Sequence, residues 1–341
     1  MMELFERMKT LCALDGISGR EQDVSAEILR QLEGVADEAR RDSLGNVIAF
    51  KKGRKTPAHR LMLAAHMDEV GLIVTGITED GFLRFATVGG LDMKVVLGRR
   101  VKVNGLTGVI ATKALHRLTA EERKDIPAAD KLCIDIGAKD REEAEQYVSL
   151  GDSVTLVGDW LDFGDGFSAA KALDDRAGCA MLLQMMEEGL EYDTWFAFTV
   201  QEEIGTRGAK TAAFGVEPDF AIVLETTASG DMAGVEGEKR VTLVGGGAVV
   251  SYMDHTAIYD RELYQLAFRV AKERGIPCQT KTAIAGGNDS GSIQTARGGC
   301  RVCAISAPCR YLHSPVDAAK RSDLQAVYDL ARAMAEAIGA L

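Results

Sequence analysis

Two apolar runs in the sequence each end in residues that can bind a metal or transfer a proton. Residues 61–65, Leu-Met-Leu-Ala-Ala, lead directly into His66, with Asp68 two positions later. Residues 195–201 lead in the same way into the adjacent carboxylates Glu202 and Glu203. Histidine and carboxylate ligands together suit zinc, cobalt or manganese better than calcium or magnesium. The two runs therefore indicate metal-assisted acid/base chemistry.

A third apolar run, residues 220–224, ends in Glu225. Apolar runs of this length are typical of buried strands in a parallel sheet. Open α/β sheets build their sites beyond the carboxyl ends of such strands. We therefore expect the three runs to deliver their polar residues to one shared site. His66 alone could equally be held by an ordinary hydrogen bond, and a Glu-Glu pair is often just solvated, but here the preceding run is too apolar for that.

Two further residues join this set. His313 lies in a dense polar context after an apolar run, and Asp174 follows an apolar pair at the start of a helix expected over 174–189. Asp174 could point into the site, where one carboxylate can bridge two cations. Its neighbour Asp175 is expected to be an ordinary helix cap. The other histidines end no buried strand and are expected to have ordinary structural contacts: His59, His116 and His255.

The distribution of helix and strand patterns predicts an α/β protein with an insertion. Residues 3–33 look helical with a break at 16–19, and Ser18 stands three positions before Glu21, the spacing of a capping box. From about residue 70 to 163, frequent glycines separate short β-rich runs, which is typical of a small barrel or sandwich. One helix is expected there, over about 141–150.

Strands and helices alternate again after residue 171. We expect strands at 195–201, 220–225 and 301–306, and helices at 207–214, 260–274 and 322–339. The predicted architecture is a mixed, largely parallel sheet sandwiched by helices. It comprises a catalytic domain of residues 1–69 and 164–341 and an inserted β-rich domain of residues 70–163.

Composition limits the partners. The formal net charge is −11, which argues against nucleic acid as the main partner. No apolar stretch is long enough for a membrane span, and the first residues lack a signal-peptide core, so we expect a cytoplasmic protein without a membrane partner.

The seven cysteines are expected to be free thiols. Among them, Cys300, Cys303 and Cys309 are expected to be buried strand residues rather than zinc ligands. The glycine-rich segment 285–292 lacks the ending of a phosphate-binding loop, so no nucleotide cofactor is expected.

Over nearly its whole length the chain resembles the glutamyl and tetrahedral aminopeptidases, a family of two-metal peptidases with some members labelled cellulases. The resemblance is carried by segments 42–47, 65–71, 109–113, 134–138, 171–176, 200–209 and 310–315. It implies two divalent metal ions per subunit, zinc or cobalt, with manganese as a further candidate. It also implies that the inserted domain mediates dimerisation and that dimers assemble into a hollow dodecamer.

The resemblance also implies individual roles. His66 would bind the first metal, Asp174 would bridge both, and Glu203 and His313 would hold the second. Glu202 would be the general base, and Asp68 the carboxylate that fixes a metal-bound histidine. The remaining ligand of the first metal is usually an aspartate, where this chain has Glu225. A second departure is Val-Gly-Gly-Gly-Ala at 244–248, where relatives carry a Lys-Gly-Pro stretch.

The predicted function is removal of the amino-terminal residue of short peptides. Another two-metal amidohydrolase, such as a carboxypeptidase or deacetylase, would share the site but read a different end of the substrate. A glycosidase using Glu202 and Glu203 is the third possibility, but its two carboxyl groups must flank a sugar bond, and it needs no histidine ligands. The preferred amino-terminal residue does not follow from the sequence.

Overall fold

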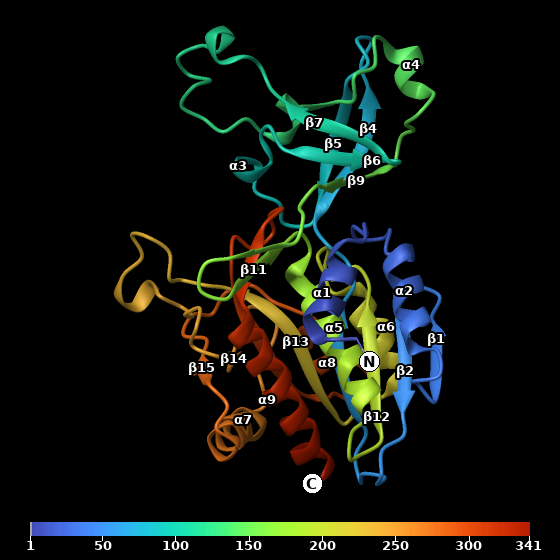
Figure 1. Ribbon diagram of the computed structural model, residues 1–341, viewed down its shortest axis with the longest axis vertical. Coiled ribbons are helices and arrows are strands. Elements are labelled where there is room, and N and C mark those ends of the chain that lie inside the picture. Colours follow the sequence, from blue (N-terminus) through green and yellow to red (C-terminus); the bar gives the residue numbers. More distant parts are fainter. Residues whose placement is uncertain (1) are drawn as a thin grey trace.

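The computed structural model describes residues 2–341 and consists of a large helix-covered sheet with a smaller barrel at one end (Figure 1). The large sheet has the mixed, largely parallel character that the sequence predicts. In spatial order its strands are β1 Glu38–Arg41, β2 Val47–Lys51, β12 Thr194–Thr199, β3 Leu61–His66, β13 Phe220–Ala228, β16 Arg301–Arg310, β17 Asp317–Lys320, β11 Phe167–Ala170 and β10 Leu161–Phe163, with β14 Ala248–Val250 and β15 Cys278–Thr280 beside β16.

The centre of the sheet brings three of the predicted site strands together. Strands β12, β3, β13 and β16 run parallel to one another. The register pairs Thr199 with His66 across β12 and β3, and Glu225 with Ser306 across β13 and β16. The carboxyl ends of these strands therefore meet at one edge, as expected for parallel neighbours.

Helices cover both faces of the large sheet, and each face has its own apolar core. The larger core takes its helical residues from α1 Leu4–Cys12, α2 Gln22–Leu32, α5 Leu173–Glu188, α7 Arg261–Arg274 and α9 Arg321–Gly339. The smaller core lies under α6 Arg207–Val216 and α8 Ser290–Gln294. Two layers of helices around one sheet leave its parallel centre buried, which explains why these strands read as continuous apolar runs.

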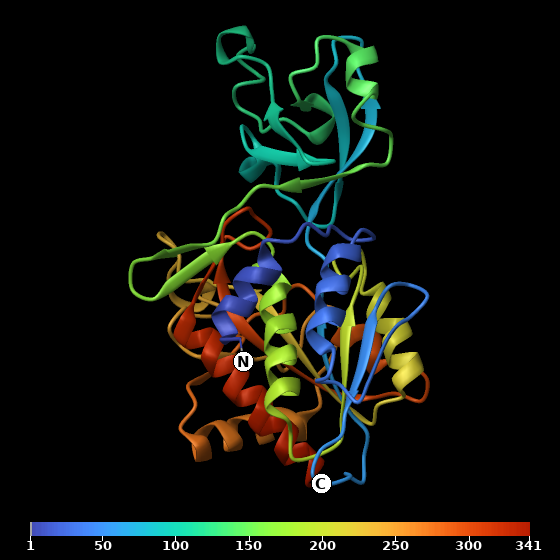
Figure 2. The ribbon, with the colours of Figure 1, turned by 45° about the vertical axis from the view of Figure 1, so that its right-hand side comes forward.

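The inserted unit is a closed antiparallel barrel with its own apolar core. Its strands, in order around the barrel, are β4 Gly71–Ile77, β5 Leu83–Val88, β8 Cys133–Asp135, β7 Leu106–Ala111, β6 Arg100–Val103 and β9 Ser153–Leu156, with helices α3 Met93–Val96 and α4 Arg141–Glu145 and the short 3-10 segments η1 Leu115–Arg117 and η2 Ala129–Lys131. Strand β10 pairs with β11 of the large sheet, and their hairpin projects from the main body in Figure 2. The division into domains at residues 70 and 163 stays a prediction.

Several local predictions differ from the structure. Ser18 does not cap the second helix, which begins at Gln22 and has no side-chain cap; the Ser18 hydroxyl instead donates to the Asp68 carboxylate over 2.6 Å. Helix α4 ends at Glu145 rather than near residue 150. Strand β12 stops at Thr199, because Gln201 adopts a left-handed conformation with φ 56° and turns the chain.

A fully buried arginine ties the broken helical segment at the amino terminus to the site edge. Arg176, in α5, donates to the carbonyl oxygens of Leu11 (2.7 Å) and Met67 (2.6 Å). Its guanidinium also lies 3.4 Å from the carboxylate of Glu69, which accepts from Lys171 over 2.8 Å. A buried charge needs such partners, so the segment around residues 11–16 is held against the end of β3.

Among residues 2–341, no helix is both long and apolar enough to cross a membrane.

Candidate active site

Two groups of potential metal ligands lie at the carboxyl edge of the large sheet and share one residue. His66, Asp174 and Glu225 form the first group, with the ligand atoms within 4.8 Å of one another. Asp174, Glu203 and His313 form the second group, within the same limit. The structure thus brings together all five residues to which the family resemblance assigns metals.

The carboxylate of Asp174 lies between the two histidines. Its Oδ1 is 3.6 Å from His66 Nε2, and its Oδ2 is 3.4 Å from His313 Nε2. Each histidine has a second carboxylate near the same nitrogen: Glu225 Oε1 at 3.4 Å from His66 and Glu203 Oε1 at 3.3 Å from His313. The extra methylene of Glu225, where an aspartate was expected, therefore does not take its carboxylate out of the first group.

Hydrogen bonds on the far side of each imidazole point the Nε2 atoms toward these carboxylates. His66 Nδ1 lies 3.0 Å from the main-chain oxygen of Asp68, and His313 Nδ1 lies 2.8 Å from the main-chain oxygen of Gly90. A carbonyl oxygen can only accept, so Nδ1 carries the proton in each ring. Nε2 of the neutral ring then offers its lone pair to a cation, the arrangement usual for metal-bound histidine.

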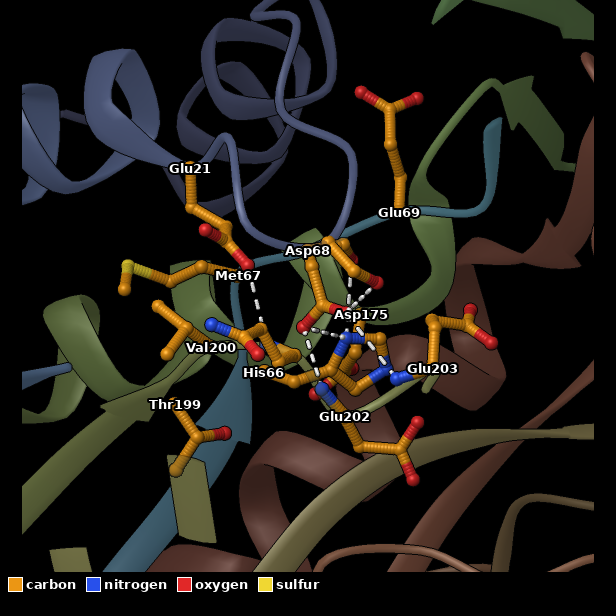
Figure 3. Close-up of polar contacts among 12 residues, drawn as sticks. Glu21, His66, Met67, Asp68, Glu69, Asp175, Thr199, Val200, Glu202 and Glu203 are labelled. Carbon is orange, nitrogen blue, oxygen red and sulfur yellow. Dashed lines mark hydrogen bonds and ion pairs between the residues drawn. The ribbon is translucent and has the colours of Figure 1, made fainter. Parts of the chain in front are cut away.

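Asp68 was expected to fix a metal-bound histidine, but its carboxylate mainly contacts the main chain at Glu202 and Glu203. Its carboxylate oxygen lies 3.5 Å from His66 Nδ1, farther than its own carbonyl oxygen. The carboxylate instead accepts the main-chain N–H groups of Glu202 (3.0 Å) and Glu203 (3.1 Å), as Figure 3 shows. It also accepts the Ser18 hydroxyl. Because the turn at Gln201 aims both N–H groups at one acceptor, Asp68 fixes the loop that carries the two glutamates.

The site concentrates negative charge in a buried setting. Burial and the neighbouring Asp174 raise the pKa of Glu203 to about 7, and burial raises the pKa of Glu225 to about 8. Burial opposes the charge on His313, but the carboxylates of Asp174 and Glu203 still raise its pKa to about 10. Oδ1 of Asp174 is buried and lacks a hydrogen-bond partner in the described part of the chain. Cations between these groups would supply the missing partner and relieve the repulsion, so the residues present fit two metal ions.

Glu202 lies beside both groups without belonging to either. Its side chain lines the same cavity as the candidate ligands and is largely buried, and burial raises the pKa of its carboxyl well above the usual value. The cavity has a volume of about 640 Å³ and extends beyond the ligands along the end of β13. A carboxylate that borders the ligands but is not one of them is available for proton transfer.

Some contributors to the site gave no usable signal in the sequence. Asp289, in the glycine-rich segment, is buried and accepts a hydrogen bond from the Thr199 hydroxyl at the end of β12. Gly90 belongs to the inserted barrel, yet its carbonyl oxygen holds His313. Both contacts join segments far apart in the chain, so neither spacing nor local pattern could have indicated them. Asp175 is not the ordinary helix cap that was predicted: it is buried inside α5, whose N-cap is Ala172, although its Oδ1 accepts from the N–H of Gly178 over 3.0 Å.

The remaining candidates lie away from the two ligand groups. The rings of His59 and Phe220 pack edge to face, with centroids 5.4 Å apart, and neither His116 nor His255 belongs to a ligand group in the described residues. The cysteines of the described chain are all free, and Cys300, Cys303 and Cys309 are buried in or beside β16, as the sequence predicts.

Comparisons with known proteins show the family to which the chain is similar. A family model for M42 glutamyl aminopeptidases matches residues 45–330. A putative aminopeptidase from Acetivibrio thermocellus is 41% identical over 325 residues, covering 94% of this chain and 95% of that protein. A lysyl aminopeptidase from Pyrococcus furiosus is 32% identical over 351 residues, covering 97% and 96% of the two chains.

The fold also matches a solved structure of a Pyrococcus horikoshii TET1 peptidase, which is described as able to assemble into a tetrahedron or a large octahedral shell. The TM-score is 0.86 at 33% sequence identity, and the match covers 98% of this chain and 99% of that one. The family match, the sequence relatives and the fold agree over nearly the full length. The chain therefore belongs to the M42 glutamyl aminopeptidase family, whose members are metal-dependent hydrolases of peptide bonds.

Proposed function

We propose that this protein is an aminopeptidase that removes the first residue of short peptides with the help of two divalent metal ions, zinc or cobalt, with manganese as a further candidate. The observation that carries the proposal is the position of Asp174, with one oxygen toward each histidine. In this proposal His66, Asp174 and Glu225 hold one ion, and Asp174, Glu203 and His313 hold the other. When bound, such ions polarise the scissile carbonyl and lower the pKa of the attacking water.

The protein's own part in the chemistry is proton transfer and positioning. Glu202 accepts a proton from the attacking water and returns it to the nitrogen of the leaving amine. Burial raises the pKa of the Glu202 carboxyl, and positive charge nearby would lower it again, so bound cations would favour the ionised form that accepts the proton. Asp68 keeps Glu202 in place through the main-chain bond to its N–H.

The other enzyme classes fit the site less well. A glycosidase places two carboxyl groups on either side of a sugar bond, with a separation of roughly 5–9.5 Å, and needs no histidine. Here the acids gather around two imidazoles that are both oriented by carbonyl oxygens. A carboxypeptidase would favour an arginine for the terminal carboxylate, and none of the described residues that line the cavity is arginine.

A comparison of free and blocked peptides tests the proposed function. An enzyme that captures the free α-amine loses that anchor when the amine is acetylated, and a buried group left without its partner costs about 1–3 kcal/mol. We expect the metal-loaded protein to release the first residue of short free peptides and to leave their acetylated forms almost untouched, as followed by mass spectrometry. Internal cuts in blocked peptides, or cleavage of soluble cellulose with untouched peptides, would overturn the proposal.

Replacement of Glu202 by glutamine separates its role from metal binding. Glu202→Gln should retain its metal content but lose at least ~100-fold in turnover, because the amide cannot accept the proton. Metal analysis and kcat for an aminoacyl anilide provide the measurements. Glu273→Gln, on the exposed face of α7, serves as the matched control and should behave like the wild type. Near-normal turnover of Glu202→Gln would exclude this residue as the base.

We further propose that the chain forms a closed homo-oligomer, in which the inserted barrel mediates dimerisation and the dimers assemble into a dodecamer. The proposal is supported by the similarity to the TET1 peptidase, which is described as able to assemble into a tetrahedron or a large octahedral shell. The cytoplasmic location expected from the sequence stays a prediction.

Removal of the barrel tests its role in assembly. Leu72 of β4 pairs with Val154 of β9, so the two crossings between barrel and sheet lie side by side and a short Gly-Ser linker can replace residues 71–156. This cut keeps β10 in the large sheet. Light scattering should report a closed assembly for the wild type and a much smaller species for the variant. A variant that still forms the large assembly would show that the barrel does not mediate it.

A further inference from the structure

The turn that carries Glu202 has three consecutive main-chain N–H groups that donate to carboxylates. The N–H groups of Glu202 and Glu203 donate to Asp68. The N–H of Gln201 donates instead to the carboxylate of Glu21, over 3.1 Å, and Figure 3 shows the Glu21 side chain directed toward this part of the chain. The turn is therefore held by two acids from different parts of the sequence.

The backbone of this turn has a conformation that its neighbours must maintain. Gln201 is left-handed, with φ 56°, a region that residues with a side chain rarely adopt. Such a conformation persists only where surrounding contacts fix it. On the far side of the turn, the carbonyl oxygen of Glu202 accepts the N–H groups of Gly205 and Thr206, each over 2.8 Å. The hydrogen bond at Gln201 fixes the near side, from which the chain enters Glu202.

The side chain of Glu21 does not serve the helix at whose start it stands. Glu21 occupies the N-cap position of α2, yet it makes no side-chain cap hydrogen bond. Its Oε1 accepts the N–H groups of Gly19, over 2.6 Å, and of Gln201. The Ser18 hydroxyl likewise turns away from the helix and donates to Asp68. Both residues of the predicted capping box are therefore directed toward the groups that hold the turn.

Glu21 is an acid held in an unfavourable place. Its side chain is buried, and in the described residues its carboxylate contacts main-chain N–H groups rather than a cation. Burial and the nearby carboxylate of Asp68 raise the pKa of Glu21, and the N–H donors only partly oppose this. A buried acid without a cation costs stability. Since this one does not cap its helix, the turn at Gln201 is the structure that its presence maintains.

We infer that Glu21 is a positioning residue for the proton-transfer step, which holds the turn at Gln201 so that the Glu202 carboxyl stays at the reaction centre. The inference rests on the proposed function, in which Glu202 is the base. A displacement of about 1 Å at a reacting group can cost on the order of 100-fold in rate. The candidate ligand on the same turn, Glu203, has its own main-chain bond to Asp68, so metal binding does not depend on Glu21.

Two substitutions of similar size isolate the hydrogen bond to Gln201. Glu21→Met fills the same space without an acceptor, whereas Glu21→Gln keeps a carbonyl oxygen there. In Glu21→Met, kcat for an aminoacyl p-nitroanilide should fall by about 10- to 100-fold, with KM within a few-fold and the metal content unchanged. Glu21→Gln should recover most of the turnover. Glu33→Met, exposed at the other end of α2, is the matched control and should behave like the wild type.

A double variant shows whether Glu21 acts through Glu202. Once Glu202→Gln has removed the base, adding Glu21→Met should lower the residual rate by less than about twofold, because the two residues then belong to one unit. A merely structural role would lower the rate by the same factor in both backgrounds.

Several results would overturn the inference while leaving the aminopeptidase function intact. These are a normal kcat in Glu21→Met, loss of metal or of folding by circular dichroism in that variant, no recovery in Glu21→Gln, and losses that multiply in the double variant. A metal-loaded wild type that cleaves no anilide or free peptide would instead overturn the proposed function, and the inference with it.

Discussion

The chemistry of this site depends on one buried carboxylate shared between two histidine-containing groups. Asp174 has an oxygen near each imidazole, and one of these oxygens lacks a hydrogen bond within the protein. Three further carboxyl groups crowd around it, so the site without cations carries strong electrostatic repulsion. The rest of the fold can be understood as the scaffold that keeps these groups together.

That scaffold combines the carboxyl ends of parallel strands with hydrogen bonds from residues outside those strands. Strands β3 and β13 deliver His66 and Glu225, and the turn after β12 delivers the two glutamates. Asp68 fastens this turn, and Ser18 supports Asp68 from the segment between the first two helices. Arg176 holds that segment in turn through its carbonyl oxygens. A single site thus uses parts of the chain as distant as residues 11 and 313.

The barrel also belongs to the site. Gly90 provides the carbonyl oxygen that orients His313, and Gly89 has a left-handed conformation with φ 81°. A side chain at Gly89 would bring its Cβ to 3.2 Å from that of Glu203. Gly89 and Gly90, in the inserted segment, therefore lie against two of the residues proposed to hold one ion.

Sequence reasoning identified the parallel strands and the residues at their ends because both depend on local pattern. Apolar runs predicted β3, β12 and β13, and the polar residues after them marked the site edge. The individual roles of Asp174 and His313 came from the family resemblance, since spacing alone does not bring them to these strands. The contacts of Ser18 and Gly90 could not be predicted, because each depends on where a loop from a distant part of the chain comes to lie.

The metal content of an Asp174→Ala variant tests the shared carboxylate most directly. Inductively coupled plasma mass spectrometry after dialysis against defined zinc should find two ions per wild-type subunit, about one in Glu203→Ala, and almost none in Asp174→Ala, because only Asp174 serves both groups. Circular dichroism would establish that each variant is folded, and Asp329→Ala on the exposed face of α9 would serve as the control. An Asp174→Ala protein that is folded and still holds two ions would contradict the account.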